Sequence, residues 1–293
     1  MGRRSAFTQL GTLAAIGLAL LGFAGWAHAH GTYHDRLAAA SSKIEAHPDR
    51  AILYVERAHL YRGHRDFAEA MADLDRAEAL DPELIDTDFM RGLVYLDLEE
   101  PENADTALSR VLTKSPEHVA ALEARGRTRM LLGRYLAAAR DYDLAIAHQA
   151  TPQPEPYLVR ARALAAAGDE HLPEAIAGLD AGLARMGPAV TLEQAALQLE
   201  LQMGATDAAL ERLDRTAARS PRKDTWLARR GQILEGAGRD AEARRSYEEA
   251  LAALSKLPAS RRRAAASRDL EGQIHEALER LSQKSVAGES SGP

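Results

Sequence analysis

Apolar residues recur along the chain at helical spacing, in pairs of segments that short polar turns separate. In the clearest case, apolar stripes cover residues 51–63 and 67–80, and a turn sequence lies at residues 63–66. Pro82 then ends the second stripe, because proline has no backbone N–H and restricts the residue before it. The pattern predicts two paired helices joined by a tight turn.

This pattern repeats with a period of 34 residues. Two runs of prolines mark the period, with spacings of 34, 34, 34 and 33 residues: Pro48, Pro82 and Pro116, then Pro154, Pro188 and Pro221. Small residues follow the same period in two series: Ala58, Gly92 and Gly126, then Ala70, Ala104 and Ala138. Small residues are needed where paired helices cross closely, so the register predicts a close helix crossing in each unit.

The repeat resembles the tetratricopeptide repeat (TPR) family, whose unit carries a large residue, Gly or Ala, and a large residue, followed by Ala, an aromatic residue or Leu, Ala and Pro. Six units match this pattern: 51–84, 85–118, 119–152, 156–189, 190–223 and 224–257. The unit 190–223 matches least well, since Leu197 stands where Gly or Ala is expected. The resemblance implies an all-α fold, a right-handed α-solenoid of helical hairpins.

Amphipathic helices are predicted at both ends of the repeats. Residues 30–50 predict an N-terminal half-repeat helix with one apolar face: Tyr33, Leu37, Ala40 and Ile44. Residues 258–283 predict a capping helix whose apolar stripe closes the stack: Leu270, Ile274, Ala277, Leu278 and Leu281. Residues 284–293 are rich in Ser and Gly, which predicts a disordered tail. A three-residue insertion near residues 152–156 predicts a stiff bend within one solenoid rather than an interdomain linker.

The first residues resemble an export signal. An apolar segment over residues 10–27 follows a basic pair at positions 3 and 4, and Ala27-His28-Ala29 supplies the small residues that a signal peptidase reads. This predicts a signal peptide over residues 1–29, cleaved after Ala29, and a periplasmic or secreted protein. The alternative is an uncleaved inner-membrane anchor through residues 10–27, because eighteen apolar residues can just span a bilayer.

The amino-acid composition excludes several classes of site and of fold. The absence of cysteine excludes disulfides, thiolate metal sites and a cysteine nucleophile. Seven Val, eight Ile and 5% aromatic residues are too few for a sizeable sheet. A net charge of −6 argues against general nucleic-acid binding. The chain also lacks a Gly-rich phosphate loop, a GxSxG turn and an HExxH helix, so we expect no enzyme activity and no cofactor.

The N-terminal histidines offer one alternative chemistry. A chain cleaved after Ala29 would begin with His30 and carry His34 nearby, and an N-terminal amine beside imidazoles can chelate copper or nickel. No matching cluster follows at metal-ligand spacing. A metal-handling protein is therefore the less favoured alternative, and no metal ligand is assigned.

The resemblance also implies a binding groove, because the first helices of TPR hairpins line a concave face where partner peptides bind. The groove candidates run from apolar through basic to amide-rich side chains: Val55, His59, Phe89, Leu93, Arg127, Arg160, Gln198 and Gln232. An acidic segment with an apolar anchor would then fit, with the anchor over Phe89 and carboxylates over Arg127 and Arg160. The alternative is that Phe89 and Leu93 pack against a neighbouring helix.

Together these features predict a non-catalytic scaffold of the bacterial cell envelope that binds a partner protein or peptide. The same chemistry would serve an envelope assembly or biogenesis factor with one specific client. The sequence does not choose among clients.

Overall fold

The computed structural model describes residues 33–218, 220 and 222–290. The predicted signal peptide (residues 1–29), with the alternative anchor inside it, lies outside the described residues, as do residues 30–32 and residues 291–293 of the predicted tail. Within the described residues the chain is helical and contains no strand. The predicted all-α class is therefore confirmed.

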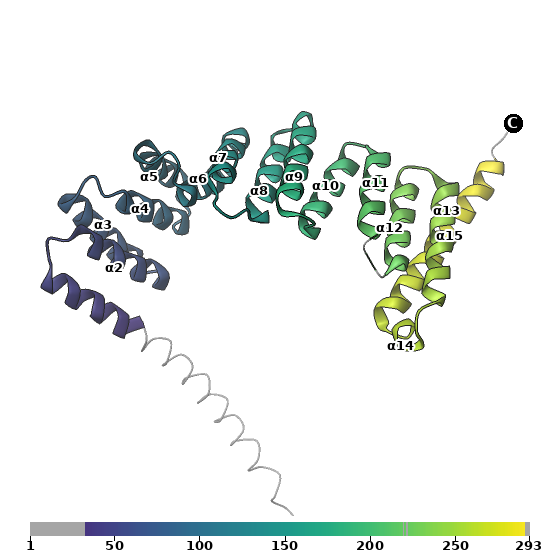
Figure 1. The fold of residues 1–293 in the computed structure, drawn as a ribbon, viewed down its shortest axis with the longest axis horizontal. Helices are drawn as coiled ribbons and strands as arrows, with labels where there is room; N and C mark the ends of the chain where they lie inside the picture. The colour runs from purple at the N-terminus through teal and green to yellow at the C-terminus, as the bar shows by residue number, and fades with distance from the viewer. Residues whose placement is uncertain (1–32, 219, 221, 291–293) are drawn as a thin grey trace, which may run out of the picture. The chain divides into compact units, whose positions relative to one another are not determined.

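The helices pack as two compact units, one ending at His148 and the other beginning at Gln149. In the first unit, a helix over residues 33–46 precedes three hairpins (Figure 1). These are α2 (Ala51–His64) with α3 (Phe67–Leu80), α4 (Ile85–Asp97) with α5 (Pro101–Lys114), and α6 (Val119–Leu131) with α7 (Tyr135–His148). Consecutive hairpins contact each other through α3 and α4 and through α5 and α6.

The second unit contains three more hairpins and the C-terminal helices. The hairpins are α8 (Pro154–Ala167) with α9 (Leu172–Met186), α10 (Val190–Gln202) with α11 (Thr206–Ala217), and α12 (Lys223–Gly236) with α13 (Asp240–Ser255). A 3₁₀ turn, η1 (Asp169–His171), joins α8 to α9, and the short α14 (Ala259–Arg262) precedes α15 (Ala265–Ser290). Thus the proline-rich insertion, predicted as a bend inside one solenoid, lies at the boundary between two units.

Small residues lie where the two helices of a hairpin cross. A Cβ atom on Gly92 would lie 2.7 Å from Leu108 Cγ, and one on Gly126 would lie 2.8 Å from Tyr142 Cε2. Real Cβ atoms do not approach other atoms this closely, so the helices meet where only glycine fits. The expectation that Gly126 occupies a helix crossing is confirmed.

The turns inside five hairpins use the left-handed backbone region. The residues with positive φ are Arg65 (70°), Glu99 (60°), Gly133 (68°), Gly204 (71°) and Gly238 (72°). Each stands at the same position of the 34-residue unit. Glycine adopts this conformation freely, whereas a residue with a Cβ atom is strained there by about 1–2 kcal/mol.

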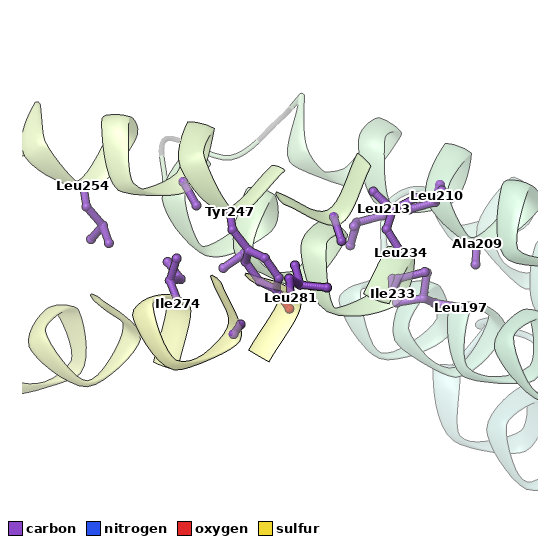
Figure 2. Close-up of a cluster of buried hydrophobic side chains, with 14 residues drawn as sticks. Leu197, Ala209, Leu210, Leu213, Ile233, Leu234, Tyr247, Leu254, Ile274 and Leu281 are labelled. Carbon is purple, nitrogen blue, oxygen red and sulfur yellow. The ribbon is translucent and has the colours of Figure 1, made fainter. Parts of the chain in front are cut away.

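The C-terminal helix closes the second unit by burying its apolar stripe. Figure 2 shows Tyr247 of α13 close to Ile274 and Leu281 of α15, and all three side chains are buried in one cluster. Beyond this stripe, Lys284 Nζ pairs with Asp240 Oδ2 at 3.0 Å, and α15 continues to Ser290. Residues 284–290 are thus helical, where the sequence predicted a disordered tail.

Candidate functional site

A hollow of about 530 Å³ opens in the first unit, between the helix over residues 33–46, α2 and α4. Apolar side chains form part of its wall: Ala39, Ala40, Ile52, Val55, Leu60 and Met90. Charged and polar side chains complete it: Arg36, Lys43, Glu56, His59 and Asp86. Two residues that the sequence placed in the groove, Val55 and His59, therefore line one concave site; His59 is exposed and Val55 is buried in its wall.

The hollow lies beside a helix face that no helix of the described residues covers. In the first complete hairpin, Ala70 and Ala77 of α3 are fully buried against α2. One period earlier, the same positions carry Arg36 and Lys43, and both are exposed. A long cation does not fit at a crossing that needs a small residue. This face of the N-terminal helix is therefore suited to solvent or a ligand rather than to a closely packed helix.

The charged rim of the hollow is weakly held. Lys43 Nζ lies 3.6 Å from Glu56 Oε2, and both side chains are more than half exposed. Exposed ion pairs of this kind contribute little to stability, so they can exchange partners at low cost. The hollow thus combines an apolar wall with a rim of both charges.

Phe89 and Leu93 lie differently from the exposed groove anchors that the sequence suggested. Both are half-buried and pack against a cluster that includes Leu108 and Leu122. The ring of Phe89 also lies 5.0 Å from that of His118, centroid to centroid. The alternative, packing against neighbouring helices, describes these two residues better than an open anchor does.

Arg127 and Arg160 do not form the paired basic site that was expected. Arg127 is exposed on α6, and burial of the nearby Glu123 raises the pKa of that carboxyl group, although Arg127 opposes the shift. Arg160 is buried on α8 and donates from Nη2 to Glu174 Oε1 on α9 at 2.6 Å. Because a buried guanidinium needs its carboxylate partner, Arg160 is not available to a ligand. The two arginines also belong to different units.

Comparisons with known proteins agree with the helical geometry. The tetratricopeptide repeat family model matches residues 89–154 and 195–258. The chain therefore carries tetratricopeptide repeats. No curated protein sequence matches it.

Several solved structures are similar to the chain at low sequence identity. YrrB, described as a TPR protein with an unusual peptide-binding site, has a TM-score of 0.52 and 22% identity, covering 62% of this chain and 93% of its own. Naa15/Naa10 bound to HypK-THB gives a TM-score of 0.55 and 16% identity, covering 88% of this chain but 40% of that one. A TPR protein from Parabacteroides merdae gives 0.47 and 20%, covering 84% and 90%. At these identities the likeness concerns the fold alone.

The amide-rich end of the TPR groove candidates lies in the second unit. Gln198 on α10 and Gln232 on α12 are both exposed, and Gln232 accepts a hydrogen bond from Arg229 Nη1 at 3.1 Å. Gln232 also lines a second hollow of about 590 Å³, together with Gln273 and Arg280 of α15. The sequence pattern did not predict that α15 lines this hollow, because its apolar stripe indicates only a helix that closes the end of the stack.

The described part of the chain shows neither a metal-binding cluster nor a membrane-spanning helix. No group of three or more His, Asp or Glu side chains there is arranged to bind a metal ion. Among the same residues, no helix is both long enough and apolar enough to cross a bilayer. Of the histidines in the metal-handling alternative, His30 lies outside the described residues, whereas His34 lies on the helix over residues 33–46.

Proposed function

We propose that this TPR protein is a non-catalytic scaffold of the bacterial cell envelope that binds a partner protein or peptide in the hollow of its first unit. The observation that carries the proposal is the open, partly apolar hollow between the helix over residues 33–46, α2 and α4. An exposed apolar concavity with a polar rim is typical of a site for a peptide or a partner helix. The described peptide-binding site of YrrB is compatible with this use of the fold.

The partner would place an apolar side chain against Ile52, Val55 and Met90. Burial of that side chain would supply most of the affinity. The charges of the rim, among them Arg36 and Asp86, would orient the partner and speed its association. The acidic partner that was expected to lie over Arg127 and Arg160 is not retained, because Arg160 already pairs with Glu174.

An envelope location is part of the proposal, and the N-terminal helix supports it. The 34-residue register would place the apolar leader, residues 17–29, as the first helix of the leading repeat. That helix would have to pack on Arg36 and Lys43 instead of on small residues. Removal of the leader after Ala29 leaves this face open to a partner. Intact-mass measurement of the exported protein tests the step: a chain starting at His30 or His28 agrees, and retention of Met1 in the membrane fraction contradicts it.

The site is tested by filling the hollow. Ala39→Trp places a large ring at an exposed position of the hollow's wall, so it should leave the fold intact and block the partner. Ala72→Trp adds the same ring at an exposed position of α3 and serves as the control. Immobilised proteins capture partners from envelope extract. A partner that wild type and Ala72→Trp retain and Ala39→Trp loses supports the proposal. Equal capture by all three proteins overturns it.

A further inference from the structure

The connection between α13 and α15 concentrates positive charge on an otherwise acidic protein. Residues 256–268, here named the basic connection, contain five cations and no carboxylate: Lys256, Arg261, Arg262, Arg263 and Arg268. All five side chains are exposed. The whole chain, by contrast, has a net charge of −6. The basic connection is therefore locally positive, although the net charge of the chain is negative.

These five cations differ from other arginines of the second unit. Arg222, Arg239 and Arg280 each form an ion pair with a carboxylate of the same unit. Within the described residues, no carboxylate pairs with any cation of the basic connection. Arg262 alone makes a specific contact, donating from Nη1 to the carbonyl oxygen of Ser255 at 3.0 Å. The N–H groups of the other four cations are therefore accessible to an anionic partner.

The basic connection lies at one end of the second unit's helices. Figure 1 shows α14 at the end of the last hairpin, where α13 ends and α15 begins. Lys223, at the start of α12, shares a hollow of about 540 Å³ with Lys256, so a sixth cation adjoins the connection. Two carboxylates line the same hollow: the buried Asp224, which is paired with Arg222, and the exposed Glu249, so the cations of this end outnumber its carboxylates but are not alone there. The positive charge therefore gathers at an end of the fold rather than inside a groove.

We propose that the basic connection docks this protein on an anionic phospholipid surface. Four of its five cations are arginines, whose planar guanidinium groups match the oxygens of a phosphate. The connection contains no aromatic residue, and its one large apolar residue, Leu257, is half-buried against the core cluster. Binding is therefore peripheral and electrostatic, without an inserted anchor, and it weakens as salt rises.

Other polyanions fit the basic connection less well. A single-stranded nucleic acid needs aromatic side chains on which bases stack, and the connection has none. An acidic peptide gains affinity from an apolar groove beside its charges, whereas these cations occupy a connection at the end of a hairpin. A bilayer presents many phosphates on one broad surface and needs neither feature. The proposal concerns the second unit and is independent of the partner site in the first.

Vesicle co-sedimentation of the full chain tests the proposal. The variant Arg261→Gln, Arg263→Gln, Arg268→Gln removes three cations and keeps the Arg262 hydrogen bond. The matched control, Arg76→Gln, Arg140→Gln, Arg215→Gln, removes the same charge from exposed positions of α3, α7 and α11. All proteins carry the same N-terminus, so any contribution of the leader is equal. The probes are phosphatidylcholine vesicles with and without phosphatidylglycerol.

We expect binding that requires phosphatidylglycerol and falls with salt. The connection variant should partition about a hundredfold less, since each of the three removed cations contributes about 1 kcal/mol near an anionic surface. The control variant should bind like wild type. Equal weakening by both variants, or equal binding to vesicles without phosphatidylglycerol, overturns the proposal. A second result would also overturn the proposal. In it, wild type binds polyglutamate or single-stranded RNA more tightly than the connection variant does, but does not bind the vesicles.

Discussion

The third and fifth hairpins each have an ion pair between their two helices, but the charges stand on opposite helices in the two cases. In the third, Arg129 of α6 donates from Nη1 to Asp141 Oδ2 of α7 at 2.8 Å. In the fifth, Glu200 of α10 accepts from Arg212 Nη2 of α11 at 2.7 Å. Residues 129 and 200 share one position of the repeat, and residues 141 and 212 share another. In these two hairpins an ion pair therefore joins the two helices at the same positions, with the signs of the charges exchanged.

The two pairs also differ in their further partners. The Asp141 side chain is 2% exposed and also accepts hydrogen bonds from Arg125, so two cations surround one buried carboxylate. The Arg212 side chain is 4% exposed and pairs with Asp180 of α9 as well as Glu200. Burial disfavours the charged form of Arg212, but the hydrogen bonds that Arg212 donates to Glu200 and Asp180 outweigh it and raise the Arg212 pKa above its ordinary value.

The two hairpins also differ at the helix crossing. Gly126 of the third hairpin meets the ring of Tyr142, whereas the fifth carries Leu197 at the same repeat position. Leu197 and Leu213 are buried in the core cluster of the second unit. The third hairpin thus depends on close approach of its helices, and the fifth on apolar burial and the ion network of Arg212. Two predictions test this contrast directly, and two more test smaller contributions of the first and second hairpins.

The largest effect is expected for Arg212→Leu. The change leaves Glu200, whose side chain is 7% exposed, as a buried carboxylate without its cation. Loss of one partner of a buried pair costs about 3–5 kcal/mol. Urea unfolding followed by Trp226 fluorescence reports on this unit. Arg215→Leu, at an exposed position of the same helix, is the control and should be nearly neutral. Equal small shifts for both variants would mean that the network does not hold the hairpin.

The next effect concerns the glycine crossing of the third hairpin. Gly126→Leu introduces the residue type of the fifth hairpin where Tyr142 leaves no room, and we expect a loss of about 1–3 kcal/mol. Glu117→Ala, in the turn before α6, should cost well under that. Thermal melts by circular dichroism compare the two. Similar shifts for both variants would place the crossing elsewhere.

A smaller gain is expected in the second hairpin, where the turn carries a side chain that the third and fifth hairpins avoid. Glu99 has a φ of 60°, whereas Gly133 and Gly204 occupy the same turn position in the other two hairpins. Glu99→Gly should stabilise the fold by about 0.5–1 kcal/mol, the relief of left-handed strain less the extra freedom of the unfolded chain. The reverse change, Gly204→Glu, should destabilise it. A lower melting temperature for Glu99→Gly would contradict the strain argument.

The smallest effect is a pH dependence. A hydrogen bond from Arg91 lowers the pKa of Glu78, with burial opposing the shift. Because the folded pKa is depressed, this stabilisation is present above the usual carboxyl pKa and is lost as pH falls through the folded value. The Glu78 side chain is about half exposed, so we expect less than about 0.5 kcal/mol. Glu78→Gln should lose less stability between neutral and acidic pH than wild type; an equal loss would exclude the pair as a source.

Much of the fold is predictable from the sequence, because small residues and prolines recur with one period. Ala58, Ala70 and Gly126 all lie at buried positions of the hairpins, as the register requires. The site is less predictable. The groove position of Arg160 faces Glu174 on the neighbouring helix, and only packing shows that this pair is buried. Nor does the period alone show that the leading helix leaves a hollow beside α2.

Site-specific photo-cross-linking from Ala39 in living cells tests the binding hollow most directly. A photoreactive residue at position 39 should give a covalent adduct with a partner protein, and adduct formation should fail when Ile52→Asp places a charge in the apolar wall. The same photoreactive residue at position 72, on the exposed face of α3, should give none. Adducts of equal yield from both positions, or none from position 39, would contradict a partner bound in the hollow.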